Sequence, residues 1–224
     1  MSSLLNKLGF RLLPSGIHFL VFTWCTGIAI GFAILFAHAA KPGLQYASPH
    51  HWPSDVEIER PTDVSTLLFF VHPQCPCTFA SLAELERAVA QSGSSLETIL
   101  VLNCPTEKLD EWMQTAIVDR AKGITRARIF VDGDGQLSAK FRASVSGQCL
   151  LYSPNGQLLF QGGLTASRGH EGESLGQALL IRMLAHREAK EFENQQALEV
   201  PVYGCELIRS QPLGVPSATC CKAN

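Results

Sequence analysis

The chain has 224 residues, of which 46% are hydrophobic and 17% are charged, and its formal net charge at pH 7 is −2. No basic stripe accompanies this near-neutral balance, so the sequence gives no support for nucleic-acid binding. The length is sufficient for one domain with a substantial core, and no internal repeat or low-complexity tract divides it.

The first predicted element is a long apolar helix. Lys7 and Arg11 are the early charges, and residues 17–40 contain no Asp, Glu, Lys or Arg. A bilayer-spanning helix needs about 20 apolar residues. We therefore expect residues 1–16 to be cytoplasmic, residues 17–40 to anchor the chain in the membrane, and the remainder to be extracytoplasmic (periplasmic). Ala37-His38-Ala39 offers a signal-peptidase pattern, so a cleaved signal peptide is the alternative.

A proline-rich segment follows the apolar helix. Residues 41–61 contain Pro42, Pro49, Pro53 and Pro61 among polar residues, which predicts an extended stalk rather than a packed element. We place the folded domain at residues 62–199. A proline-broken, cysteine-containing tail at residues 200–224 completes the chain.

Short apolar runs predict strands that are buried on both faces. They cover residues 66–71, 96–104 and 126–132, and residues 149–163 predict a hairpin that turns at Asn155-Gly156. Apolar residues at helical spacing predict the helices between the strands, at 77–93, from Thr106 to Gly123, at 133–143 and from Ser174 onward. This order predicts an α/β fold with a mostly parallel sheet and an antiparallel pair at its edge.

Three motifs carry a resemblance to a known superfamily. They are "FFVHPQCPC" (69–77) before a helix, "IFVD" (129–132), and the hairpin "SGQCLLYSPNGQLLFQGG" (146–163). Over residues 62–190 the chain resembles the thioredoxin-like superfamily, and within it the membrane-tethered proteins of bacterial envelopes. The stretch "SRGHEG" (167–172) is similar to a thioredoxin-like group labelled RedB. The resemblance implies a thioredoxin-like fold, with a mixed sheet and flanking helices, in the cell envelope.

The paired cysteines Cys75 and Cys77 are the candidate redox centre. Pro76 between them suits the first position of a helix. A helix N-terminus favours a thiolate, so we expect a lowered thiol pKa and reactivity near neutral pH. The resemblance implies thiol-disulfide exchange with protein thiols and disulfides of the envelope, without a cofactor. We expect Cys75 to attack a substrate disulfide and Cys77 to resolve the mixed disulfide.

The pair departs from the superfamily in two ways. One residue separates the cysteines where two are usual, so a bridge between them closes a small, strained ring. Ser146-Gly147 replaces the usual Thr and cis-proline, and a cis peptide is not expected without proline. Gly147 is expected to leave open space beside the sulfurs for a metal, a ligand or a partner's backbone.

The predicted topology brings further residues to the same end of the sheet. The loop after the hairpin carries Arg168, which lowers a nearby thiol pKa, and His170, which can transfer protons. His72 is a third candidate because it directly precedes the pair. Either histidine can instead bond only to loop backbone.

The remaining cysteines have separate expectations. Cys104 and Cys149 adjoin buried strands and are expected in the core, whereas Cys205 is a candidate resolving thiol or metal ligand. Cys220 and Cys221 can bridge each other, bridge another chain, or have no role. Outside the apolar helix the cysteines are odd in number, so at least one is free, metal-bound or shared with a partner.

Two other functions compete with thiol-disulfide exchange. Soft thiolates suit Cu(I), so Cys75 and Cys77 with His72, His170 or Cys205 predict a copper binding or delivery site. This spacing also resembles the copper-delivery branch of the superfamily. A thioredoxin-like scaffold without catalysis is the third possibility.

Overall fold

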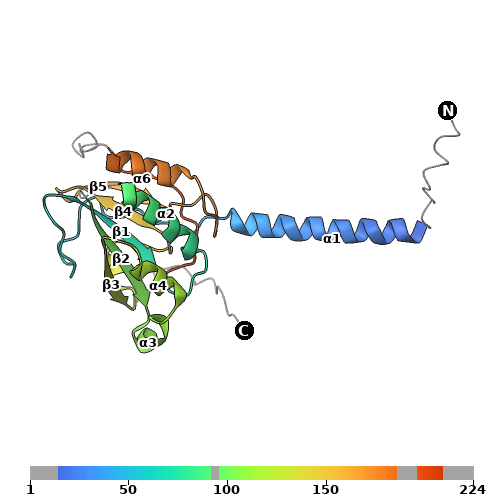
Figure 1. Ribbon diagram of the computed structural model, residues 1–224, viewed down its shortest axis with the longest axis horizontal. Coiled ribbons are helices and arrows are strands. Elements are labelled where there is room, and N and C mark those ends of the chain that lie inside the picture. Colours follow the sequence, from blue (N-terminus) through green and yellow to red (C-terminus); the bar gives the residue numbers. More distant parts are fainter. Residues whose placement is uncertain (1–14, 92–95, 186–195, 209–224) are drawn as a thin grey trace. The chain divides into compact units, whose positions relative to one another are not determined.

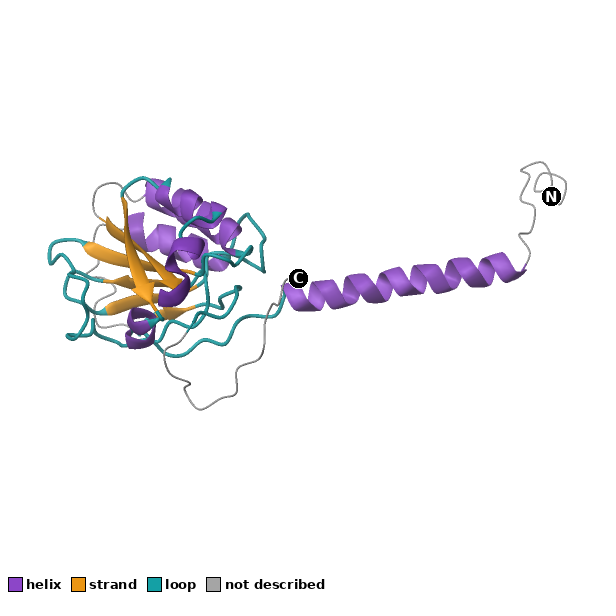
Figure 2. Ribbon diagram, turned by 90° about the horizontal axis from the view of Figure 1, so that it is seen from below, coloured by secondary structure: helices purple, strands orange, loops and turns teal. Residues whose placement is uncertain are grey.

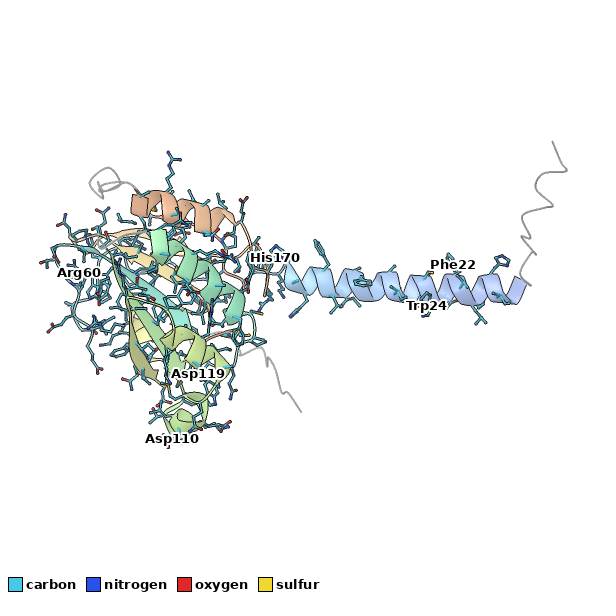
Figure 3. All side chains as sticks on the ribbon, in the orientation of Figure 1. Phe22, Trp24, Arg60, Asp110, Asp119 and His170 are labelled. Atoms are coloured by element: carbon cyan, nitrogen blue, oxygen red, sulfur yellow. The ribbon has the colours of Figure 1, made fainter. Side chains whose placement is uncertain are left out.

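The computed structural model describes residues 15–91, 96–185 and 196–208, and it divides at Ala39 into two compact units (Figure 1). The first unit consists of helix α1 (Ser15–Ala39). Within it, Gly16–Ala39 is long and apolar enough to cross a membrane, by length and composition alone. Phe22 and Trp24 project outward from this helix and are largely exposed (Figure 3). A signal sequence has the same properties, so both predictions for this segment stand.

The second unit is built on one six-stranded sheet (Figure 2). The strand order is β3-β2-β1-β4-β5-β6, with β1, β2 and β3 parallel and β4 antiparallel to both β1 and β5. The strands are β1 (Ser65–Val71), β2 (Leu96–Cys104), β3 (Ala127–Gly133), β4 (Cys149–Tyr152), β5 (Leu158–Gly162) and β6 (Leu198–Glu199). The predicted mixed sheet with a parallel half and an antiparallel hairpin is confirmed.

Two apolar layers cover the sheet. Helices α2 (Thr78–Gln91), α4 (Ala116–Lys122) and α6 (Leu175–Ala185) lie on one face, with α2 in contact with both of the others (Figure 1). Helix α5 (Gln136–Lys140) covers the other face, where Phe70, Phe141 and Tyr152 pack together. Strand β1 has apolar neighbours on both faces, which explains its uninterrupted apolar sequence.

The segment predicted as a stalk packs against the domain instead. Trp52 makes edge-to-face contacts with Phe141 and Tyr152, at ring-centroid distances of 5.0 and 5.2 Å. Ile58 is 5% exposed, and the Tyr152 hydroxyl donates to the carbonyl of Pro49. The prediction of a spacer from residue 41 to 61 was wrong, because prolines prevent a helix but leave carbonyls and apolar side chains free to pack.

The single helix predicted from Thr106 to Gly123 is three shorter pieces. A 3-10 turn η2 (Thr106–Lys108) precedes α3 (Leu109–Trp112), and α4 starts only at Ala116. The Thr115 hydroxyl accepts a hydrogen bond from the N–H of Val118 and so caps α4. Thr106 instead bonds through its N–H and hydroxyl to the carboxylate of Asp134. Apolar spacing alone did not reveal this break.

Candidate functional site

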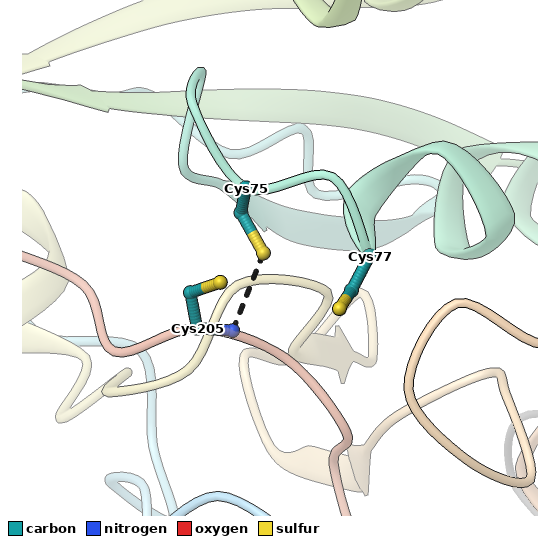
Figure 4. A group of neighbouring side chains, drawn as sticks. All are labelled: Cys75, Cys77 and Cys205. Atoms are coloured by element: carbon teal, nitrogen blue, oxygen red, sulfur yellow. Dashed lines mark hydrogen bonds between the residues drawn. The ribbon is translucent and has the colours of Figure 1, made fainter. Parts of the chain in front are cut away.

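Three cysteines meet at one end of the sheet. The sulfurs of Cys75, Cys77 and Cys205 all lie within 4.8 Å of one another (Figure 4). Cys75 is 0% exposed, whereas Cys77 and Cys205 are half-buried. We call these three residues the trithiol centre.

The turn between β1 and α2 carries two of the three sulfurs. Strand β1 ends at Val71, and Cys75 donates its N–H to the carbonyl of His72 and accepts the N–H of Thr78 on its own carbonyl. Helix α2 begins at Thr78, so Pro76 lies in the preceding turn rather than at the first helical position as predicted. The two sulfurs therefore lie just before the helix N-terminus, where its partial positive charge still favours a thiolate.

The C-terminal segment carries the third sulfur. Residues 198–208 pair with the domain from β6 onward, and Cys205 accepts the N–H of Ser146 on its carbonyl at 2.8 Å. Leu207 donates its N–H to the carbonyl of Ser144, and Ile208 exchanges two bonds with the Asn103 side chain. The predicted tail comprised residues 200–224, and its residues 200–208 lie on the domain. Cys220 and Cys221 lie outside the described residues.

Two glycines allow this close approach. A Cβ at Gly204 would lie 1.9 Å from the carbonyl oxygen of Ser146, so only glycine fits there. Gly147 has φ of 88°, and its added Cβ would lie 2.8 Å from the Ser81 hydroxyl of α2. The open space predicted beside Gly147 is therefore absent, and this residue packs the 144–148 loop against α2. No cis peptide bond occurs in the described ranges, as expected for Ser146-Gly147.

Hydrogen bonds concentrate negative charge on Cys75. The pKa of Cys75 lies well below its ordinary value, because the thiols of Cys205 and Cys77, the Thr78 hydroxyl and the Cys205 N–H all donate to its sulfur, which outweighs burial. The bond to Cys75 is the largest cause of a raised pKa at Cys205, followed by the bond to Cys77 and by burial. For Cys77, the bond to Cys205 acts to lower the pKa, but the bond to Cys75, burial and the Cys75 charge together raise it.

Ser146 connects the two backbone segments around the cysteines. Its hydroxyl accepts the N–H of His72 at 2.9 Å and shares a hydrogen bond of 2.8 Å with the Thr78 hydroxyl. Both residues flank the cysteine pair, so Ser146 holds each end of the turn. Sequence reasoning noted Ser146 only as a replacement for the expected threonine, and a lone serine in a loop carries no further signal.

The other predicted site residues have different surroundings. Arg168 binds the carbonyls of Gly204 and Lys41, and its positive charge acts to lower the Cys77 pKa. His72 stacks on Trp112, with ring centroids 4.9 Å apart, and burial lowers its pKa despite the Cys75 charge. His170 is exposed on the loop before α6 (Figure 3).

Neither histidine belongs to the group of potential ligands. Among the described residues, the group that brings ligand atoms within 4.8 Å of one another consists of Cys75, Cys77 and Cys205. Of the metal ligands proposed from sequence, the structure thus brings the three cysteines together and leaves His72 and His170 out. Cys205 was named from sequence only as one option, because a proline-broken tail gives no register from which to place it.

Comparisons with known proteins define the fold rather than a family. No family model matches the chain, and no curated protein matches it either. An uncharacterized conserved protein from Geobacillus kaustophilus is 17% identical over 77% of this chain and 94% of its own, with a TM-score of 0.52. A hypothetical protein from Sinorhizobium meliloti 1021 is 17% identical over 67% of this chain and 82% of its own, with a TM-score of 0.50.

A secreted disulfide oxidoreductase of Mycobacterium tuberculosis, described as homologous to Escherichia coli DsbE, is 14% identical over 55% of this chain and 81% of its own, at a TM-score of 0.38. At 17% identity, the likeness to the two proteins with TM-scores of 0.50 and 0.52 concerns the fold alone. The central strand β1 leads directly to a cysteine pair at the start of α2, and an antiparallel hairpin completes the sheet. The chain therefore has a thioredoxin-like α/β fold, preceded by one N-terminal apolar helix.

Proposed function

We propose that this protein is a membrane-anchored, extracytoplasmic thiol-disulfide oxidoreductase of the RedB-like type. The observation that carries the proposal is the pairing of a buried, hydrogen-bonded Cys75 with a half-buried Cys77 directly before a helix N-terminus. Helix α1 would hold the domain at the membrane, facing protein thiols and disulfides of the cell envelope. Arg168 and Gly147 would act as positioning residues of the site.

From the burial of the two cysteines we infer the reverse of their expected roles. Cys75 has no exposed surface, so a protein substrate cannot reach its sulfur directly, whereas Cys77 is partly open to solvent. We therefore assign contact with substrate to Cys77. Cys75 is the internal partner, and its hydrogen bonds make it a good leaving thiolate, because a low-pKa thiol leaves faster in exchange.

The reaction in the oxidising direction balances as follows. A substrate thiolate attacks Sγ of Cys77 in a Cys75–Cys77 bridge, that S–S bond breaks, and Cys75 leaves as a thiolate. A second substrate thiolate then attacks the substrate sulfur of the mixed disulfide, which releases Cys77. Two electrons pass from the substrate thiols to the cysteine pair, and the reverse sequence reduces a substrate disulfide.

The test uses full-length protein in detergent, equilibrated in glutathione buffers of graded potential, trapped by alkylation and read by mass spectrometry. Reversible pairing within the trithiol centre at a defined potential supports the proposal. Cys77→Ser should abolish exchange with an external protein disulfide, whereas Cys75→Ser should accumulate an unresolved mixed disulfide on Cys77. The control Cys25→Ala changes a cysteine of α1 and should behave as wild type. Full exchange activity in Cys77→Ser would refute the assignment.

Soft-metal binding is the second candidate, and the trithiol centre favours it. Three sulfurs within 4.8 Å of one another form a soft donor set of the kind that suits Cu(I), and a structural zinc site normally has four ligands. The residues present thus fit copper better than zinc. Cys75, Cys77 and Cys205 would hold the ion, with no need for His72 or His170, and bound copper would supply a site for storage or delivery.

Copper binding is tested by dialysing the reduced, Cu(I)-loaded protein against a Cu(I) chelator of known affinity. Retention of one equivalent of Cu(I) supports the proposal. Each single cysteine-to-serine change should then lower the affinity for Cu(I), while His170→Ala should leave it unchanged. Equal retention by the triple cysteine variant would exclude the trithiol centre as the ligand set.

A further inference from the structure

We propose that Cys205 is a third redox residue, and that the resting disulfide of the oxidised protein joins Cys75 to Cys205 rather than to Cys77. This inference rests on the proposed thiol-disulfide exchange and extends it, because it adds a second disulfide to the same centre. Cys77 would then be a free, half-buried thiol in the resting oxidised state.

The placement of Cys205 supports this pairing. Its sulfur lies within 4.8 Å of both other sulfurs, and its backbone N–H donates to Sγ of Cys75 at 3.3 Å. The two residues are thus in direct contact although 130 positions separate them. Rotation of the two side chains changes the distance between sulfurs that are already this close, and a bridge forms when they come to about 2.05 Å.

The two possible disulfide bridges differ in the size of the ring that each one closes. A Cys75–Cys77 bridge encloses a single intervening residue, Pro76, whose fixed φ further restricts the ring. Such a strained bridge has a more oxidising potential than a relaxed one. A Cys75–Cys205 bridge closes a long chain segment, for which the loop-entropy model gives a larger stabilisation.

The segment that carries Cys205 is held without any help from its sulfur. Cys205 accepts the N–H of Ser146, and Leu207 bonds to Ser144 on the same loop. Further along, Ile208 bonds to the buried side chain of Asn103. Arg168 also binds the carbonyl of Gly204. These contacts keep the third thiol beside Cys75 in the reduced protein, so the thiol is preorganised for exchange.

The added step is an internal exchange and needs no external oxidant. After substrate has formed the Cys75–Cys77 bridge, the thiolate of Cys205 attacks Sγ of Cys75. The Cys75–Cys77 bond breaks, the Cys75–Cys205 bond forms, and Cys77 leaves as a thiolate that takes the proton released by Cys205. The number of disulfides is unchanged. The reverse exchange regenerates the strained bridge, which is the form that meets substrate.

The experiment maps the disulfides of the oxidised full-length protein. After alkylation and trypsin digestion, the peptide that contains both Cys75 and Cys77 should be linked to the peptide that contains Cys205. In this product Cys77 should carry the alkyl group. Trypsin also cleaves after Arg209, which separates Cys205 from Cys220 and Cys221, so a link to either of those two is identified separately.

Two variants make the result decisive. Cys77→Ser should still form one reversible bridge, between Cys75 and Cys205, at the wild-type ratio of reduced to oxidised glutathione. Cys205→Ser should form only the Cys75–Cys77 bridge, at a glutathione ratio at least roughly tenfold more oxidising than wild type. Cys149→Ala, a core cysteine of β4, is the control and should leave the bridge unchanged.

Different results would overturn this inference and the proposed function. An oxidised wild type with Cys75 joined to Cys77 and with Cys205 alkylated would overturn the inference and leave the proposed function standing. A link from Cys205 to Cys220 or Cys221 would also overturn the inference. The absence of any reversible bridge among the three cysteines would overturn both.

Discussion

The backbone N–H of Cys205 donates a hydrogen bond to Sγ of Cys75 at 3.3 Å, which joins the C-terminal segment to the turn that opens α2. The contact has two effects. It stabilises negative charge on the sulfur, and it holds the C-terminal segment against a residue that has no exposed surface. The reactivity of Cys75 therefore depends on a residue far away in sequence, and the first two predictions test each effect.

The first prediction concerns the charge on Cys75. Because its pKa lies well below the ordinary value, the reduced protein should retain one thiolate as pH falls from neutral into the acidic range. The ultraviolet absorbance of the thiolate against pH measures this. Cys205→Ala removes the thiol that contributes most to the shift but keeps the backbone N–H, so the absorbance should be lost at a higher pH than in wild type. Cys104→Ala should leave the curve unchanged, and a thiolate signal that survives in Cys75→Ser would assign the charge to another residue.

The second prediction concerns access to Cys75. A Cβ at Gly204 would lie 1.9 Å from the carbonyl oxygen of Ser146, so Gly204→Ala should displace the segment that covers the sulfur. We expect alkylation of Cys75 at neutral pH to become at least about tenfold faster, because reactivity follows exposure of the thiolate. Timed labelling and mass spectrometry report each cysteine separately. Gly27→Ala in α1 is the control, because nothing lies within 4 Å of its added Cβ. An unchanged rate at Cys75 in Gly204→Ala would mean that the segment does not limit access.

The third prediction separates the charge of Arg168 from its hydrogen bonds. Its charge acts to lower the pKa of Cys77, and its guanidinium binds the carbonyls of Gly204 and Lys41. Arg168→Gln removes the charge, so the Cys77 pKa should rise and its alkylation near neutral pH should slow by up to about tenfold, the change for one pKa unit. Arg168→Lys keeps the charge and should retain most of the rate. Equal slowing in both variants would show that the bonds, not the charge, set the reactivity of Cys77.

The sheet and the cysteine turn were predictable because their signals are local. Strand β1 is apolar from Leu67 to Val71, and Asn155-Gly156 marks the hairpin directly. A strand followed at once by two cysteines and a helix places those sulfurs at the end of the sheet. None of these inferences needs information from residues far away in the chain.

The features that were missed depend on distant contacts. Residues 198–208 have no periodicity, and their place is fixed by pairing with β5 and by hydrogen bonds to Ser146, Ser144 and Asn103. Cys75 is fully buried and Cys77 only half-buried, and the order of the two cysteines along the chain gave no sign of this difference. Nothing in the sequence around Gly147 indicated that Ser81 of α2 lies against this residue.

The fourth prediction tests the packing of the proline-rich segment, where the sequence predicted a spacer. Trp52 contacts Phe141 and Tyr152 edge to face, and its ring also lies 6.0 Å from the guanidinium carbon of Arg60. Trp52→Ala should lower the free energy of unfolding by about 2–3 kcal/mol, below the range for a fully buried tryptophan because this side chain is half-buried. Urea denaturation followed by circular dichroism measures the change.

His51→Ala, at the exposed neighbouring side chain, is the matched control and should stay within about 0.5 kcal/mol of wild type. A spacer would tolerate both changes equally, so the difference between the two variants decides between a stalk and a packed segment. If residues 41–61 are part of the domain, the domain begins directly after the apolar helix.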